Sequence, residues 1–211
     1  MSLKPDIVLV GGGGHCKVVI SILKRLDTFN ITGISDLEEN LGEEVLGIET
    51  RYTDDQLEEL HNGGIKYAFV TLGSVGIPDN RIRLFEMLKH IGFEIPLIIS
   101  IDSIVDESVE IDEGTVIMPG AIINPGTKIG KNCIINTGVI IDHDCMIGDH
   151  VHIAPGVTLS GSVKVGAGSH VGTGASVIHG IEIGSRVIVG AGSVIVNTIQ
   201  DNKKVMGVPA K

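Results

Sequence analysis

Branched aliphatic residues recur every six positions through the second half of the chain. The series begins at Val105 and ends at Ile195, and all sixteen of its members are Ile, Val or Leu. The position four residues after each member is also restricted, mostly to small or β-branched residues. This period predicts one short strand and one turn per repeat, with one aliphatic side chain pointing inward.

Three repeats would close one triangular coil, so residues 18 apart would lie above one another. Successive coils would stack through parallel strands about 4.8 Å apart. A single coil cannot bury its own inner face, so stacking has to supply the core. Residues 99–211 are therefore predicted to form an all-β parallel β-helix, a solenoid of hexapeptide repeats with a short C-terminal tail.

Residues 1–98 follow a different pattern, in which short apolar runs alternate with charged stretches. Residues 7–10, 31–35 and 67–72 indicate strands, and apolar residues at helical spacing follow at 18–26 and 84–91. Strands that alternate with helices predict a parallel sheet with crossover helices. We expect an α/β Rossmann-like domain at 1–98.

Composition narrows the class of protein. The 26 acidic and 16 basic residues give a net charge of −10, which argues against a nucleic-acid partner. No apolar run approaches the ~18 residues of a membrane span. The three cysteines are too few for a disulfide framework. We expect a soluble, cytoplasmic protein.

Residues 136–152 concentrate histidine and aspartate in a half of the chain that is otherwise nearly free of charge. His143 stands between Asp142 and Asp144. A neighbouring carboxylate can orient an imidazole and raise its basicity, which suits a general base near neutral pH. The alternative is that these residues form corners of the coil and contact solvent.

The 18-residue coil predicts two columns of residues. His143, Gly161 and His179 would form one column, and His152 and His170 another. His143 and His152 would lie on different parts of the triangle, so they could approach each other only across a subunit interface. A homotrimer with its active sites at the subunit interfaces would bring them together.

Two other kinds of chemistry are considered for this segment. A zinc site needs three imidazoles about 2 Å from one point, and His143, His150 and His152 show no spacing that favours it, so no metal is expected. Cys133 and Cys145 occupy inward positions of their repeats, where core packing explains them.

A glycine loop lies between the first strand and the first helix. Gly11–Gly14 and His15 would let backbone N–H groups and the helix N-terminus hold a phosphate. The dinucleotide fingerprint is incomplete because Cys16 stands where a third glycine belongs. Asp36 follows the second strand and could contact a ribose or a base. The alternative is an ordinary tight turn.

Together these features resemble a known family, the sugar O-acyltransferases of the sialic-acid O-acetyltransferase (NeuD) type. The resemblance is carried by residues 12–15, the hexapeptide repeats, residues 142–144 with His152, and the closing residues 206–211. One branch of the family N-acetylates UDP-4-amino sugars. The resemblance implies a left-handed β-helix and acetyl-CoA as the co-substrate.

The resemblance also implies roles for individual residues. His143 would be the base, Asp144 would raise its basicity, and the Gly161 N–H would meet the thioester oxygen. Residues that would contact acetyl-CoA are His152 of the neighbouring subunit, Gly161, Thr173 and Ala191. Residues that would hold the nucleotide sugar are Gly13, Gly14, His15, Ser35, Asp36 and Gly73. Ser35 departs from the acidic residue that relatives carry.

We therefore predict an acyltransferase that N-acetylates a nucleotide-linked amino sugar of the UDP-4-amino-sugar type by direct transfer. O-acetylation of a sugar such as a sialic acid is the alternative within the enzyme class. A non-catalytic solenoid scaffold is the alternative outside it.

Overall fold

The computed structural model describes residues 4–211, which divide into two compact units. Unit 1 holds the chain up to Gly73 together with Asp79–Ile98, and unit 2 holds Ser74–Pro78 and Ile99–Lys211. The sequence analysis placed Ser74–Pro78 with residues 1–98, whereas in the structure this segment packs with the solenoid.

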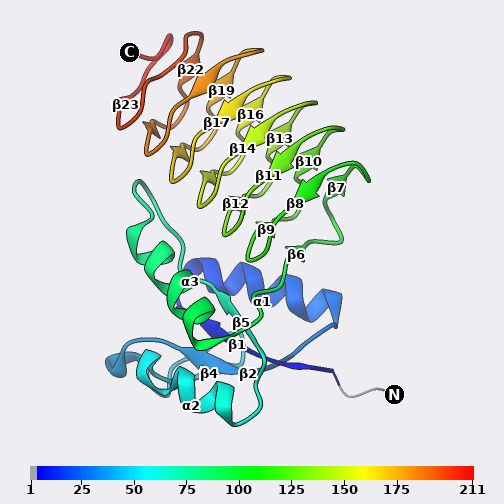
Figure 1. Cartoon of the computed structure of the whole chain (residues 1–211), viewed down its shortest axis with the longest axis vertical. Helices are drawn as coiled ribbons and strands as arrows, with labels where there is room; N and C mark the ends of the chain where they lie inside the picture. The colour runs from blue at the N-terminus through cyan, green and yellow to red at the C-terminus, as the bar shows by residue number, and fades with distance from the viewer. Residues whose placement is uncertain (1–3) are drawn as a thin grey trace. The chain divides into compact units, whose positions relative to one another are not determined.

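Unit 1 is built on a five-stranded sheet with the order β3-β4-β2-β1-β5 (Figure 1). The strands are β1 (Asp6–Val10), β2 (Asn30–Ser35), β3 (Glu44–Val45), β4 (Ile48–Tyr52) and β5 (Tyr67–Val70). The helices are α1 (Gly14–Leu26), α2 (Leu57–Asn62) and α3 (Asp79–Ile91), with short 3₁₀ turns η1 (Glu38–Asn40) and η2 (Asp54–Gln56). The pairs β1–β2, β1–β5 and β2–β4 are parallel, as predicted.

The β3–β4 hairpin at the edge of this sheet was not predicted. Its two strands pair antiparallel, so the sheet is mixed. The hairpin carries few apolar residues and only Val45 and Thr50 in it are buried, so it gives no hydrophobic run that would mark a strand.

Unit 2 is a stack of two-residue strands that form three parallel sheets, drawn from green to red in Figure 1. Sheet I contains β7 (Ile104–Val105), β10 (Ile122–Ile123), β13 (Ile140–Ile141), β16 (Thr158–Leu159), β19 (Ser176–Val177) and β22 (Val194–Ile195). Sheet II contains β8 (Glu110–Ile111), β11 (Lys128–Ile129), β14 (Met146–Ile147), β17 (Lys164–Val165) and β20 (Glu182–Ile183). Sheet III contains β6 (Ile98–Ile99), β9 (Val116–Ile117), β12 (Ile134–Ile135), β15 (His152–Ile153), β18 (His170–Val171), β21 (Ile188–Val189) and β23 (Lys204–Val205).

The register of these sheets confirms the predicted coil. Ile140 pairs with Ile122 on one side and with Thr158 on the other, which are steps of 18 residues. The six-residue series is buried from Ile117 to Ile195 and forms one core. Cys133 and Cys145 are fully buried in that core, as free thiols.

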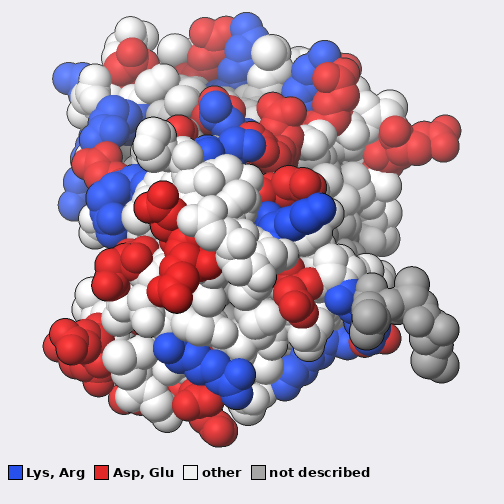
Figure 2. All heavy atoms as spheres, turned by 60° about the horizontal axis from the view of Figure 1, so that its bottom comes forward, with Lys and Arg blue, Asp and Glu red and all other residues white. Residues whose placement is uncertain are grey.

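Charge on the surface is mixed in sign. Figure 2 shows Asp and Glu side chains interleaved with Lys and Arg over the face in view. On sheet II, Lys128 pairs with Glu110 and Lys164 with Glu182, each from one coil to the next. No helix within residues 4–211 is long and apolar enough to cross a membrane.

Candidate functional site

His143 and Asp144 form a hydrogen-bonded pair at the corner between β13 and β14. Asp144 adopts a left-handed backbone with φ of 58°, and its Oδ2 lies 2.8 Å from Nδ1 of His143. A carboxylate oxygen only accepts, so Nδ1–H donates and Nε2 keeps its lone pair. This hydrogen bond, with the charges of both flanking carboxylates, raises the pKa of His143 above its ordinary value of 6.5. The side chain is about half exposed, at 51%.

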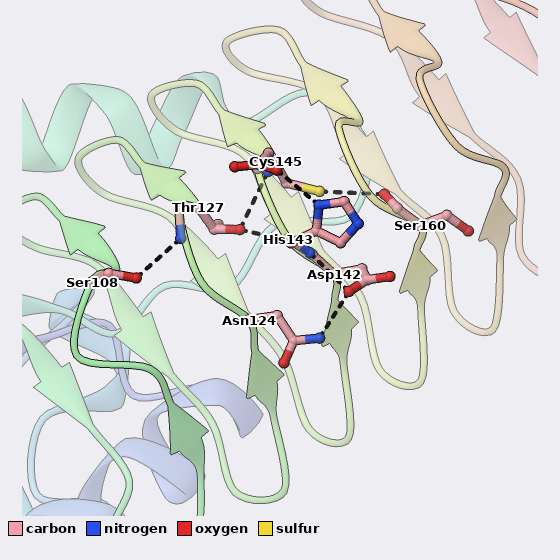
Figure 3. Close-up of polar contacts among 9 residues, drawn as sticks. Ser108, Asn124, Thr127, Asp142, His143, Cys145 and Ser160 are labelled. Carbon is pink, nitrogen blue, oxygen red and sulfur yellow. Dashed lines mark hydrogen bonds and ion pairs between the residues drawn. The ribbon is translucent and has the colours of Figure 1, made fainter.

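Asp142 is held in place on the other side of His143. Its Oδ1 accepts the His143 backbone N–H and the Asn124 side-chain amide, both at 2.9 Å (Figure 3). The hydrogen bond from Asn124 is the main reason that the pKa of Asp142 is lowered. Asp142 is therefore a fixed negative charge beside the imidazole. The sequence analysis did not name Asn124, although it stands 18 residues before Asp142.

Two further side chains brace this corner, as Figure 3 shows. Thr127 Oγ1 donates to the Asp142 carbonyl at 3.0 Å and accepts the Cys145 N–H at 3.3 Å. The Cys145 thiol points to the Ser160 carbonyl at 3.4 Å, and burial raises its pKa. Cys145 is thus a neutral, buried thiol.

Gly161 lies directly under the His143 ring. A β-carbon on Gly161 would lie 2.6 Å from His143 Nε2, so no larger residue fits beneath the ring as it stands. Within residues 4–211 no protein group accepts a hydrogen bond from the Gly161 N–H. The ring of His179 follows in the same column, with its centroid 6.3 Å from that of His143. The predicted column of His143, Gly161 and His179 is present.

The second predicted column borders a separate cavity in unit 2. The rings of His152 and His170 meet edge to face at 4.8 Å. Both line a cavity of about 630 Å³, and Thr173 and Ala191 line it as well. The structure therefore brings together three of the residues predicted to contact acetyl-CoA. Gly161, the fourth, lies outside this cavity, beside His143.

In unit 1, Asp36 lies at the carboxyl end of β2, next to the glycine loop. Its carboxylate accepts backbone N–H groups from Gly12 and Leu37. The neighbouring Ser35 is fully buried and donates its hydroxyl to Asp54 Oδ1 at 2.9 Å. Asp36 and Asp54 line a cavity of about 550 Å³. Ligands of open parallel sheets bind in such a crevice at the carboxyl ends of the strands.

The remaining predicted residues gather at the start of α1. Gly13 is the N-cap of this helix and makes no side-chain cap, and a β-carbon on Gly13 or Gly14 would meet open space. The space around Gly73 is different, since a β-carbon there would lie 3.3 Å from His15 Cβ. Burial, with the charge of Arg81, lowers the pKa of His15 to about 4. His15 is therefore neutral, and its buried Nε2 has no hydrogen-bond partner.

The other clustered histidine has a structural role. His150 occupies a corner with φ of 62°, and its Nδ1 lies 3.0 Å from the Asn132 side-chain amide one coil earlier. In the described part of the chain, no group of three or more His, Cys, Asp or Glu side chains could hold a metal ion.

Known protein families account for most of the chain. The PglD N-terminal domain matches residues 6–88. Bacterial transferase hexapeptide repeats match residues 108–143 and 126–161, and the hexapeptide repeat of succinyl-transferase matches 162–196. A comparison with curated protein sequences finds no match.

Solved structures match over the whole length. Perosamine N-acetyltransferase from Caulobacter crescentus, in complex with CoA and GDP-perosamine, is 37% identical. The match covers 99% of this chain and 97% of that chain, with a TM-score of 0.92. The acetyltransferase domain of PglB from Neisseria gonorrhoeae, in complex with acetyl coenzyme A, is 34% identical. That match covers 99% of both chains, with a TM-score of 0.89.

The fold and these matches define an acyltransferase of the hexapeptide-repeat class, with a left-handed β-helix behind a Rossmann-like domain. The predicted fold class is confirmed. More narrowly, the chain belongs to the UDP-4-amino-sugar acetyltransferase family, the branch named by the resemblance.

Proposed function

We propose that this enzyme transfers an acetyl group from acetyl-CoA to the amino group of a nucleotide-linked 4-amino sugar. The observation that carries the proposal is the His143–Asp144 pair over Gly161, a base next to a backbone N–H that no protein group occupies. The relatives support the reaction class, since one is a perosamine N-acetyltransferase with CoA and GDP-perosamine bound.

Acetyl-CoA is assigned to the cavity beside His152 in unit 2. Thr173 and Ala191 are 18 residues apart and line it together, so they form a continuous wall along the axis of the coils. The wall is largely apolar, which suits a pantetheine arm. The PglB acetyltransferase domain, at 34% identity, has acetyl coenzyme A bound.

The nucleotide sugar is assigned to unit 1. The uncapped start of α1 at Gly13 and Gly14 offers backbone N–H groups and the positive end of a helix dipole to a diphosphate. Asp36 and the cavity beside it are suited to the ribose or the base. Ser35 acts by orienting Asp54 within that cavity, since its hydroxyl is already bonded there.

The chemistry is a direct transfer. His143 Nε2 takes a proton from the sugar amine as the nitrogen attacks the thioester carbonyl, which forms the C–N bond. The oxyanion of the tetrahedral intermediate is stabilised by the Gly161 N–H. The C–S bond then breaks, and the CoA thiolate leaves with the proton that His143 carried. Asp144 orients the ring and stabilises its charged form during the reaction.

The active assembly in this proposal is a homotrimer with sites between subunits. His143 follows sheet I and His152 lies on sheet III, so one chain presents them on different faces. Ile104 and Ile140, both on the outer side of sheet I, are 66% and 40% exposed, an apolar face that a neighbouring subunit would cover. The three buried free thiols are compatible with a reducing cytoplasm.

The test is thiol release from acetyl-CoA with a panel of UDP- and GDP-linked amino sugars, and with free sialic acid. Release with a nucleotide-linked amino sugar, lost in His143→Ala and kept in His90→Ala, is the expected result. His90 is an exposed histidine on α3 and serves as the matched control. Mass spectrometry of the product should place the acetyl group on nitrogen. Release with sialic acid alone would favour O-acetylation, and absence of CoA binding would refute the transferase.

A further inference from the structure

The segment Ser74–Pro78 leaves unit 1 and packs on the solenoid. Pro78 is buried, and its ring lies within 3.8 Å of where a β-carbon on Gly168 would stand. A β-carbon on Gly76 would lie 3.6 Å from Cδ1 of Ile188 on β21. The segment therefore lies along sheet III, although its neighbours Gly73 and Asp79 belong to unit 1.

One backbone atom of this segment is hydrogen-bonded to the histidine of the acyl-donor cavity. The Ser74 carbonyl oxygen lies 2.6 Å from His152 Nδ1. A carbonyl only accepts, so Nδ1 carries a proton and donates it.

The other nitrogen of the ring is committed as well. Asn136 Oδ1 accepts the Thr137 N–H at 2.8 Å, which sets the orientation of its amide. The amide nitrogen then faces His152 Nε2 at 3.0 Å and donates to it. The ring is held as the neutral Nδ1–H tautomer. Because both nitrogens are engaged, His152 can meet an acyl donor only through its carbon atoms.

The same segment also forms part of the cavity wall. Val75 and Gly76 line the cavity of about 630 Å³ together with Thr173 and Ala191. Val75 is 92% exposed, an apolar side chain that the chain itself leaves uncovered at the rim. An apolar residue in that place is suited to contact with a pantetheine arm.

We propose that Ser74–Pro78 is a positioning segment of the acyl-donor site. Its Ser74 carbonyl, opposite the Asn136 amide, fixes His152 as a neutral ring that packs against acetyl-CoA, and Val75 closes the wall. This inference rests on the proposed function. It adds to the site a stretch of chain that lies between two elements of the nucleotide-binding unit in the sequence.

The experiment measures CoA binding by calorimetry and the His152 tautomer by ¹⁵N NMR of histidine-labelled protein. Gly76→Ala disturbs the segment because φ there is +84°, a conformation that Ala adopts with strain. Val75→Ala shortens the wall without changing the backbone. Gly47→Ala is the matched control, since φ there is +76° and a β-carbon would meet open space in the β3–β4 turn. UDP and GDP binding are measured in parallel.

In the unmodified protein we expect a protonated Nδ1 and an unprotonated Nε2 at His152. Gly76→Ala should weaken CoA binding by about tenfold and mix the tautomers, and Val75→Ala should weaken it by about fivefold with the tautomer kept. Nucleotide binding should stay unchanged in both variants, and the control should match the parent in every reading. CoA binding that is normal in both variants would overturn this inference and leave the proposed function intact. A parent protein that binds no CoA would overturn both.

Discussion

The imidazole of His143 occupies the space that a side chain on residue 161 would need. The two residues are one coil apart, and a β-carbon on Gly161 would lie within 2.6 to 3.1 Å of three ring atoms. The contact holds the ring next to a backbone N–H, so one close approach positions both the proposed base and the proposed oxyanion donor.

Gly161→Ala should abolish most of the activity without unfolding the coil. The equivalent turn position of other repeats carries Ala167 and Ala191, so this backbone accepts alanine. The added methyl group must push the His143 ring out of place, and misplacement of a catalytic group by about 1 Å can cost ~100-fold in rate. The measurement is kcat together with a thermal melt.

Glu107→Ala is the control for that substitution, because Glu107 is exposed at the same turn position of an earlier repeat. We expect it to keep both activity and melting temperature. A Gly161→Ala protein with parental kcat would contradict the role given to this contact.

Asp144→Asn should move the pH dependence of the reaction. The hydrogen bond to Asp144 is the first cause of the raised pKa of His143, and a base acts only when unprotonated. The acid limb of kcat/KM should therefore lie above pH 6.5 in the parent enzyme. In Asp144→Asn it should shift to lower pH, while the rate on the plateau falls by at least about tenfold because the base is weaker.

The profile should be recorded with a nucleotide amino sugar under limiting concentrations, so that it reports on the free enzyme. The Asp142→Asn variant is a useful comparison, since Asp142 acts on His143 through charge and a backbone contact rather than through the ring nitrogen. An acid limb that does not move in Asp144→Asn would rule out His143 as the titrating base.

Cys145→Ala should keep its activity. The thiol is fully buried, its pKa is raised by burial, and it points to the Ser160 carbonyl in the core. A direct transfer needs no acyl-cysteine, so kcat should stay within about twofold while the protein loses about 1 kcal/mol of stability. Initial-rate patterns should be sequential. An acetylated Cys145 trapped by mass spectrometry would contradict the direct transfer.

The solenoid could be predicted because its repeat ties each residue to one place in the coil. A step of 18 residues was enough to place Gly161 beneath His143 and His152 beside His170, before any coordinates. The same arithmetic would have found Asn124 under Asp142, had polar residues been compared along the columns.

Other parts of the site carry no such signal. Ser74 contacts His152 through its carbonyl, a group that every residue has, and the two are 78 positions apart in the sequence. The Asn136 amide reaches His152 from the neighbouring coil at a spacing of 16, not 18, so the repeat does not predict it. Contacts made by backbone atoms or across the register have to be seen in a structure.

The last prediction concerns the acceptor site in unit 1. A β-carbon on Gly12 would lie 2.8 Å from Asp36 Oδ2, and the Gly12 N–H donates to that same oxygen. Gly12→Ala should therefore turn the Asp36 carboxylate away from its present position. Asp36→Ala removes the carboxylate altogether. Either change should weaken binding of the nucleotide diphosphate by about tenfold, the usual cost of a lost hydrogen bond to a charged group.

The measurement is calorimetric titration of UDP and GDP, with CoA titrated in parallel. Glu39→Gln is the matched control, because it removes a nearby negative charge from η1 on an exposed side chain that does not line the cavity. CoA binding should be the same in all three variants, since its cavity belongs to unit 2. If Asp36→Ala binds both nucleotides as the parent does, the base and ribose contacts must lie elsewhere on unit 1, and the assignment to this crevice fails.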